Sequence, residues 1–175
     1  MTLYRTLCNW LWRGTLVIKI RKLKKEDKPA LMDILHNTPE FTADEVTIAE
    51  EVIDGSLDNP GKSGYFSLAA ENDEGVFTGF ISYGPVPMTQ YAWDIYWLAV
   101  RREFQGHGVG AALLKAAEEN IVQAGGRMAF IETSGKAQYD KTRRFYLTND
   151  YKEICDLPDF YAPGDNKVIY QKILG

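Results

Sequence analysis

A loop with three glycines that leads directly into a helix constrains the fold of this chain most strongly. Residues 104–119 read FQGHGVGAALLKAAEE, with Gly106, Gly108 and Gly110 on alternate positions. Apolar side chains then recur on one helical face, at Val109, Ala112, Leu113, Ala116 and Ile121. Glycine lets backbone amides come close to a bound group, and a helix N-terminus offers N–H donors and a dipole that favour an anion. The pattern therefore predicts a phosphate-binding site at the start of a helix.

Apolar periodicity places this loop inside an ordered series of strands and helices. Residues 16–23 alternate as a strand does, and residues 24–41 read as a helix. Thr42 and Glu45 form a capping box at the start of a second helix that we expect to end near Gly55. The later elements are expected to be strands at 64–72, 76–86 and 91–100, a helix at 108–124, a strand at 127–133, a helix at 138–148, and strands at 151–157 and 167–173. Hairpins before the glycine loop and a crossover helix after it predict a mixed sheet with helices on both faces.

Composition and charge argue against several classes of function. A net charge of -4 and a pI of about 5.3 disfavour nucleic acid and anionic membrane as partners. The two histidines, His36 and His107, are too few for a histidine-based metal site. A Ser-His-Asp triad is also disfavoured, because His107 lies inside the glycine loop. Cys8 and Cys155 are expected to be reduced thiols in a cytoplasmic protein.

The N-terminal residues are apolar but interrupted by charge, which argues against a signal peptide or a membrane span. We expect residues 1–15 to form an arm whose Trp10 and Trp12 pack on the domain or on a second subunit, which would make a homodimer.

Two phosphate-binding patterns fit the glycines. Gly106, Gly108 and Ala111 match the dinucleotide fingerprint G-x-G-x-x-G/A, and Glu132 ends the following strand as a ribose ligand would. In such a unit, however, the first glycine follows the strand at once, whereas residues 101–105 intervene here. Too little chain remains for the further parallel units, so a nicotinamide-dependent enzyme is the weaker alternative. The P-loop pattern fails because the loop has no Gly-Lys-Ser/Thr.

The second pattern starts at Val100 and continues through Gln105, Gly108 and Gly110. This spacing, V-x-x-x-x-Q-x-x-G-x-G, resembles the acyl-CoA loop of the GNAT superfamily of acyl-CoA-dependent N-acetyltransferases, and the order of elements is also similar. The resemblance implies an α/β fold of the α+β type, with a mixed, mostly antiparallel central sheet of about seven strands. It also implies a single N-acetyltransferase domain over residues 16–175, acetyl-CoA as cosubstrate and no metal. The implied cofactor-binding residues are Leu98, Ala99, Val100, Gln105, Gly106, His107, Gly108, Val109, Gly110, Ala111 and Thr142, with His107 directed to solvent rather than to the chemistry.

The strand before the loop carries a candidate base. Alternation puts Asp94, Tyr96 and Leu98 on one face, and on the other Trp93, Ile95, Trp97 and Ala99. The resemblance implies a bulge in this strand and a gap beside it for pantetheine, with a backbone N–H near Ala99 facing the thioester oxygen. An amine of pKa about 10 must lose a proton before it attacks. Asp94 is the first candidate for that general base and Glu132 the second.

The helix after the next strand carries a candidate acid. By resemblance, Tyr146 protonates the departing CoA thiolate. Tyr139 falls where the family commonly has Asn, which puts the usual pantetheine contact there in doubt. Asp150 replaces a common Gly, so Asn149 is expected to take the left-handed cap.

The acceptor is expected to be a small cationic amine held by aromatic and acidic side chains. The substrate-binding candidates are Phe41, Tyr83, Tyr96 and Tyr161, with Tyr91 as a further aromatic and Asp94 and Asp159 as the carboxylates. Residues 159–166 could act as a lid over this pocket. A protein N-terminus or a lysine remains an alternative acceptor, and a non-catalytic acyl-CoA sensor is an alternative function.

Overall fold

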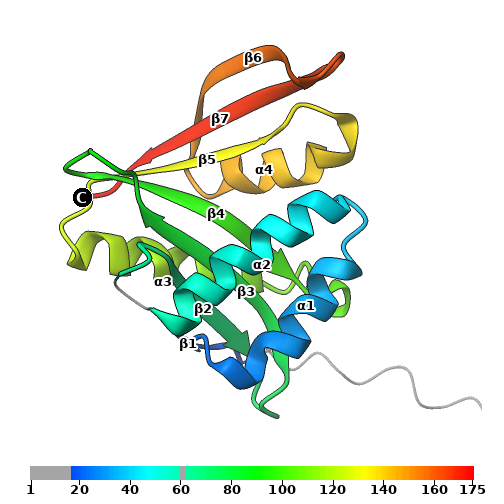
Figure 1. Cartoon of the computed structure of the whole chain (residues 1–175), viewed down its shortest axis with the longest axis vertical. Helices are drawn as coiled ribbons and strands as arrows, with labels where there is room; N and C mark the ends of the chain where they lie inside the picture. Colours follow the sequence, from blue (N-terminus) through cyan, green and yellow to red (C-terminus); the bar gives the residue numbers. More distant parts are fainter. Residues whose placement is uncertain (1–16, 60–61) are drawn as a thin grey trace, which may run out of the picture.

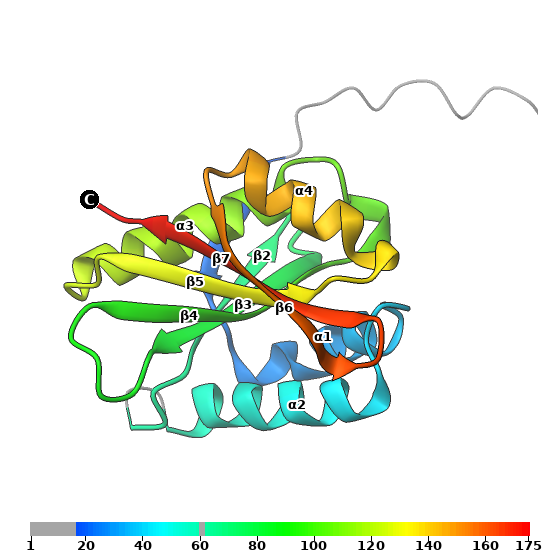
Figure 2. The same ribbon diagram turned by 90° about the horizontal axis from the view of Figure 1, so that it is seen from above.

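A seven-stranded sheet separates two pairs of helices, as Figure 2 shows from above. The computed structural model describes residues 17–59 and 62–175. The strand order is β1-β2-β3-β4-β5-β7-β6, and every neighbouring pair is antiparallel except β4 and β5 (Figure 1). The mixed, mostly antiparallel sheet predicted from the sequence is thus confirmed. The strands are β1 (Lys19–Lys22), β2 (Phe66–Glu71), β3 (Phe77–Pro85), β4 (Ala92–Val100), β5 (Met128–Ser134), β6 (Lys152–Ala162) and β7 (Asp165–Ile173).

The helices cover the two faces of the sheet and enclose two apolar clusters. They are α1 (Lys28–His36), α2 (Ala43–Asp58), α3 (Val109–Gln123) and α4 (Asp140–Thr148), with short 3-10 turns η1 (Lys25–Asp27), η2 (Arg102–Phe104) and η3 (Ala137–Tyr139). α1 and α2 pack Leu31 and Ile53 against one face, whereas α3 packs Leu113 and Ile121 against the other. Each such side chain contributes about 1.5–3 kcal/mol by leaving water. The two clusters therefore hold the sheet as a rigid platform.

β4 and β5 separate part-way along their length. Their parallel ladder runs from Ala92↔Met128 to Ile95↔Ile131, although β4 continues to Val100 and β5 to Ser134. On its other side, β4 carries a bulge, since Ser82 of β3 pairs with Trp97 while the next residue, Tyr83, pairs with Ile95. Tyr96 is the extra residue. The bulge and the gap implied by the resemblance are both present.

The bulge reverses the side-chain alternation that the sequence predicts for β4. Leu98 packs against the same cluster as Trp93 and Ile95, on the α3 face. Trp97 and Ala99 instead pack against the α1/α2 cluster. The faces predicted for the residues after Tyr96 were wrong. Side chains alternate with a period of two residues, so one inserted residue moves every later side chain to the opposite face of the sheet.

Several predicted boundaries also differ. The capping box of α2 is confirmed, since Glu45 N donates to Thr42 Oγ1 at 3.2 Å and Thr42 N donates to Glu45 Oε2 at 2.8 Å. The helix runs beyond Gly55 to Asp58. The segment 159–166, expected as a loop, instead contains the end of β6, which continues to Ala162, and the start of β7 at Asp165. Ala162 and Asp165 pair with each other, and the lid role stays a prediction.

The end of α4 is capped differently from the prediction. Asp150 takes the left-handed conformation, with φ 68°, whereas Asn149 has φ -105°. The Asn149 side chain donates to the Phe145 carbonyl at 2.8 Å instead, which occupies its amide.

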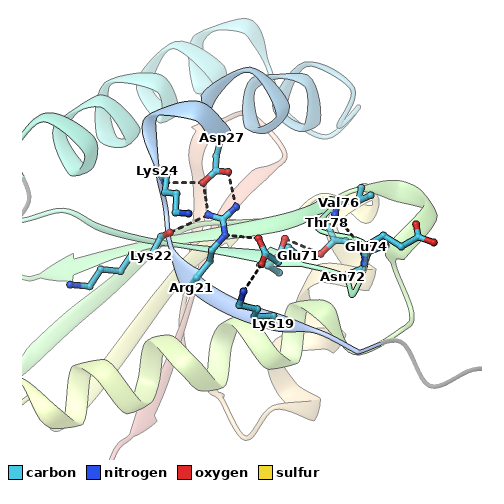
Figure 3. A network of polar contacts seen from close by, with 11 residues as sticks. Lys19, Arg21, Lys22, Lys24, Asp27, Glu71, Asn72, Glu74, Val76 and Thr78 are labelled. Carbon is cyan, nitrogen blue, oxygen red and sulfur yellow. Dashed lines mark hydrogen bonds and ion pairs between the residues drawn. The ribbon is translucent and has the colours of Figure 1, made fainter.

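An ion-pair network ties the first strand to its neighbours (Figure 3). Arg21 of β1 donates from Nε to Glu71 at 2.6 Å, and from Nη1 and Nη2 to Asp27 at 2.6 and 2.8 Å. Lys24 N also donates to Asp27, at 2.8 Å, and Lys19 pairs with Glu71 at 3.0 Å. The guanidinium therefore fastens β1 both to β2 and to the turn that begins α1.

The predicted arm at residues 1–15 lies outside the described residues, as do Trp10, Trp12 and Cys8. Among the residues that the structure does describe, no helix combines the length and apolar character needed to cross a membrane.

Candidate active site

A cleft of about 1470 Å³ opens where β4 and β5 separate. The glycine loop, the end of β4, the α1–α2 connection and the start of α4 form its walls, and Tyr161 reaches it from β6. Most of the predicted site residues meet there: Phe41, Asp94, Tyr96, Leu98, Ala99, Val100, Gln105, Gly106, Gly108, Val109, Gly110, Ala111, Glu132, Thr142, Tyr146 and Tyr161. His107 and Tyr83 do not line it.

The glycine loop has the geometry of an anion cradle. Gly106 and Gly108 have φ of 76° and 84°, a left-handed conformation that L side chains rarely adopt. A Cβ built on either residue would meet no other atom within 4 Å, so both backbones face open space. Because the first helical bond of α3 runs from Ala112 N to the Gly108 carbonyl, the N–H groups of residues 109–111 have no partner within the helix. These donors fit the pyrophosphate of CoA.

The other loop residues have structural roles. Gln105 Nε2 donates to the Val100 carbonyl at 3.1 Å and so fixes the loop to the end of β4. A Cβ on Gly110 would approach the Phe145 ring to 3.3 Å, so glycine here lets α3 pack closely on α4. His107 is exposed, with Nδ1 2.9 Å from the Gln105 carbonyl, as expected for a solvent-facing side chain.

Two carboxylates face the cleft from the adjoining strands. Asp94 pairs in register with Phe130, so Glu132, two residues further along β5, lies on the same face. Burial and then the Glu132 charge raise the pKa of Asp94, while Lys167 acts in the opposite direction. Lys167 forms an ion pair with Glu132. Asp94 is therefore the carboxylate whose affinity for a proton is increased by its surroundings.

Aromatic rings line the same cleft as these carboxylates. Tyr96 packs edge-on against Tyr65, with ring centroids 5.5 Å apart. Burial and the nearby Asp94 raise the pKa of Tyr96 to about 12. Phe41 packs edge-on against Trp97 at 5.4 Å. The cleft thus combines ring faces with negative charge, which suits a cationic amine.

Tyr146 lies at the α4 wall with its ring in the core. It is 7% exposed and packs against Phe145, Tyr151 and Tyr170. Burial, and then Tyr170, raise its pKa. The phenol is therefore protonated throughout the physiological pH range.

Three predicted acceptor residues lie away from the cleft. Tyr83 is 3% exposed, accepts a hydrogen bond from Asn120 Nδ2 at 2.8 Å, and pairs with Ile95, which faces α3. Tyr91 lies beneath the Arg127 guanidinium, 4.3 Å from its ring centroid. Asp159, near the end of β6, accepts from Gly164 N at 2.6 Å. Their aromatic or acidic character gave no information on which face they occupy.

The cleft also contains residues that the sequence did not single out as acceptor ligands. Tyr65 precedes β2, and Glu40 and Glu45 flank the start of α2. No spacing motif connects them with the glycine loop, and they meet it only through the folded sheet. Within residues 17–59 and 62–175, no cluster of His, Cys, Asp and Glu is placed to hold a metal ion.

Comparisons with known proteins agree with this geometry. A sequence profile described as "Acetyltransferase (GNAT) family" matches residues 21–149. A solved structure described as an acetyltransferase of the GNAT family, from Desulfovibrio desulfuricans, is 33% identical over 91% of this chain and 100% of its own, with a TM-score of 0.86. No curated protein matches the chain significantly.

Two more distant structures share the fold. An aminoglycoside 6'-N-acetyltransferase in complex with coenzyme A is 19% identical, with a TM-score of 0.71 over 90% of this chain and 97% of its own. The ribosomal-protein-S18-alanine N-acetyltransferase of Escherichia coli is 18% identical, with a TM-score of 0.70 over 91% of this chain and 95% of its own.

Proposed function

Because this chain belongs to the GNAT acetyltransferase family, we propose that it transfers an acetyl group from acetyl-CoA to a primary amine, with a small cationic amine as the favoured acceptor. The observation that carries the proposal is the cleft between β4 and β5, which has the glycine cradle and the pair Asp94 and Tyr146 in its walls. The proposed domain covers residues 16–175. A cytoplasmic location, an arm at 1–15 and a homodimer belong to the same proposal.

The glycine loop and the end of β4 would hold the cosubstrate. Amides of residues 105–111 would bind the pyrophosphate, supported by the N-terminal dipole of α3. Leu98, Ala99 and Val100 lie beyond the last β4–β5 pair, so β5 does not cover this edge of β4 and pantetheine would lie along it. Thr142 lines the same space from α4. Bound acetyl-CoA supplies the activated thioester, and the distant relative that contains coenzyme A supports its choice.

Asp94 would act as the general base. It takes the proton of the acceptor ammonium, directly or through a water, and so frees the amine for attack. Because its pKa is raised, the pKa of Asp94 lies closer to that of the acceptor ammonium than the pKa of an ordinary aspartate does, which makes the proton transfer less unfavourable. Glu132 is the second candidate, and its ion pair with Lys167 favours a supporting role for it.

Tyr146 would act as the general acid. Its hydroxyl donates a proton toward the sulfur of CoA as the thiolate departs. A backbone N–H near Ala99 would face the thioester oxygen, which gains negative charge during the attack. The carboxylate would thus act on the amine nitrogen, the phenol on the CoA sulfur and the backbone amide on the thioester oxygen, as direct transfer requires.

The acceptor would lie among Phe41, Tyr96 and Tyr161, near the two carboxylates. Relatives named for an aminoglycoside and for a ribosomal protein show that the fold serves both small and macromolecular amines. The acidic and aromatic lining of this cleft supports the small cationic amine.

Ligand-dependent stability tests the proposal. We expect acetyl-CoA and CoA, but not NAD, to raise the melting temperature, since a ligand at ~100 times its Kd adds about 2.7 kcal/mol of stability. A thiol-release assay over a panel of amines and peptides should then identify acceptors. Stabilisation by NAD without stabilisation by acetyl-CoA would contradict the proposal, and binding without transfer to any amine would indicate a sensor.

A further inference from the structure

One hydrogen bond bridges the walls of the cleft. The Tyr139 hydroxyl donates to the Glu40 carbonyl at 2.6 Å, and the two residues are separated by 99 positions in the chain. Tyr139 ends the η3 turn directly before α4, and Glu40 lies in the connection between α1 and α2. Both line the cleft. The hydrogen bond therefore connects two segments of the chain that line the cleft from opposite sides.

Each end of this bridge is fastened to a different strand. Beside Glu40, the Phe41 ring packs on Trp97 of β4, with ring centroids 5.4 Å apart. Near Tyr139, Arg143 Nη1 donates to the Ser134 and Lys136 carbonyls at 2.6 and 2.9 Å, which fixes α4 to the end of β5. The bridge thus joins the β4 wall to the β5 wall beyond the point where the two strands separate.

Tyr139 lines the same cleft as Glu132 and the proposed acceptor ligand Tyr161. Burial, followed by the charge of Glu45, raises the pKa of Tyr139. Tyr161, an acceptor-side candidate, has its pKa raised by burial and by Glu132, with Asp165, Glu45 and Tyr139 as further causes. Tyr139 therefore shares one electrostatic neighbourhood with Tyr161 and Glu132.

We propose that Tyr139 determines acceptor specificity: its bridge to Glu40 closes the acceptor end of the cleft, so that a small amine reaches Asp94 and a polypeptide chain does not. This inference rests on the proposed acetyltransferase function. The bond crosses the cleft between the α1–α2 connection and the turn before α4, so a peptide laid through the cleft at this level would have to displace it.

Two substitutions separate the bond from the ring. Tyr139→Phe removes the donor and keeps the ring, and Tyr139→Ala removes both. Tyr83→Phe is the matched control, because it removes a tyrosine hydroxyl with a comparable hydrogen bond, 2.8 Å from Asn120 Nδ2, outside the cleft. Melting temperatures of all variants show whether each remains folded, and Tyr139→Phe keeps the test valid if Tyr139→Ala does not fold.

The affinity for CoA conjugates that carry an acceptor group measures acceptor specificity without requiring turnover. Calorimetry should measure the Kd of CoA, of CoA joined through S–CH2–CO to one nitrogen of 1,3-diaminopropane, and of CoA joined likewise to the α-amine of a hexapeptide. We expect the wild-type protein to bind the diamine conjugate at least tenfold more tightly than the peptide conjugate. Tyr139→Ala should narrow this ratio at least tenfold, Tyr139→Phe should narrow it by less, and Tyr83→Phe should leave it unchanged. The Kd of CoA itself should stay within threefold throughout.

Three results would overturn the inference alone: equal binding of both conjugates by the wild-type protein, a ratio unchanged in folded Tyr139 variants, or weaker binding of CoA with the ratio preserved. The last would make Tyr139 a cofactor-binding residue. Failure of the wild-type protein to bind CoA would instead overturn the proposed function on which the inference rests.

Discussion

At the scale of single residues, the proposed chemistry depends on proton affinities that the surroundings shift. Burial and Glu132 raise the pKa of Asp94, and burial raises the pKa of Tyr146. The first shift makes an aspartate a stronger base, and the second keeps a phenol protonated until a thiolate forms. Each leads to a test with a matched control in the same cleft or core.

Asp94 should control the acidic limb of the pH profile. The base works only when deprotonated, so activity should fall as the pH drops through its raised pKa, above the 3.8 of an ordinary aspartate. Asp94→Asn should lower kcat/KM by about 10²–10⁴ and remove this limb. Glu132→Gln should move the limb to lower pH and Lys167→Met to higher pH, because Glu132 raises and Lys167 lowers the pKa. An unchanged limb in Asp94→Asn would assign the base elsewhere.

Tyr146→Phe should lower kcat by about 10²-fold or more while the KM for acetyl-CoA changes little, because the lost proton is needed only as the thiolate departs. The control is Tyr151→Phe. The Tyr151 ring neighbours Tyr146, but its buried hydroxyl has no hydrogen-bond partner among the described residues. Removing it should preserve kcat and leave stability equal or higher. Steady-state kinetics on both variants compare the two tyrosines, and equal losses would indicate a packing effect.

At the scale of elements, the glycine loop and β4 differ in how far the sequence predicted them. The loop, its helix and the capping box of α2 depend on local rules, and each was predicted close to its observed position. The resemblance implied a bulge in β4, but its position at Tyr96 depends on pairing between β3 and β4, for which the sequence has no local signal. Simple alternation therefore placed Leu98 and Trp97 on the wrong faces, whereas Asp94, which precedes the bulge, was placed beside the cleft.

The cradle role of the loop predicts a ligand effect beyond backbone strain. Gly108 and Gly125 have φ of 84° and 87°, and a Cβ on either meets nothing within 4 Å. Each substitution to Ala should therefore cost about 1–2 kcal/mol of stability. Only Gly108→Ala should also weaken CoA binding, by at least tenfold in calorimetry, because its Cβ would project toward the bound phosphate. Equal CoA affinities in the two variants would show that the loop does not hold the ligand.

The Arg21 network predicts how stability depends on pH (Figure 3). Burial acts to raise the pKa of Asp27, but hydrogen bonds from Arg21 hold it below its usual value of 3.8, and Arg21 and Lys19 likewise lower that of Glu71. A lowered pKa stabilises the fold above the unfolded value, and this is lost as pH falls through the folded value. Arg21→Met should thus lower the melting temperature by several degrees at pH 7, with the gap to wild type shrinking below about pH 4.

The control for this network is Lys25→Met, which breaks the exposed ion pair with Asp58. It should change the melting temperature little at any pH, because exposed pairs contribute little stability. If the difference in melting temperature between Arg21→Met and the wild-type protein stayed constant down to pH 3, Arg21 would stabilise the fold through packing rather than through charge.

At the scale of the whole molecule, the sequence predicted the donor side more fully than the acceptor side. One contiguous motif predicts the phosphate cradle, so its position is fixed by local backbone geometry. The proposed acceptor side combines the α1–α2 connection, the start of α4 and β6, which are distant in the chain. Tyr83 was therefore misplaced, and the bridge from Tyr139 to Glu40 became visible only in the folded structure.

The most direct test of the account follows the acetyl group itself. The protein should be incubated with acetyl-CoA labelled in the acetyl group and with a panel of small amines that includes 1,3-diaminopropane, and the products analysed by mass spectrometry. The account predicts label in the amide of an N-acetylated amine, with one CoA thiol released for each amide formed and far less product from Tyr146→Phe. Label found only in free acetate, or in no product while CoA remains bound, would contradict it.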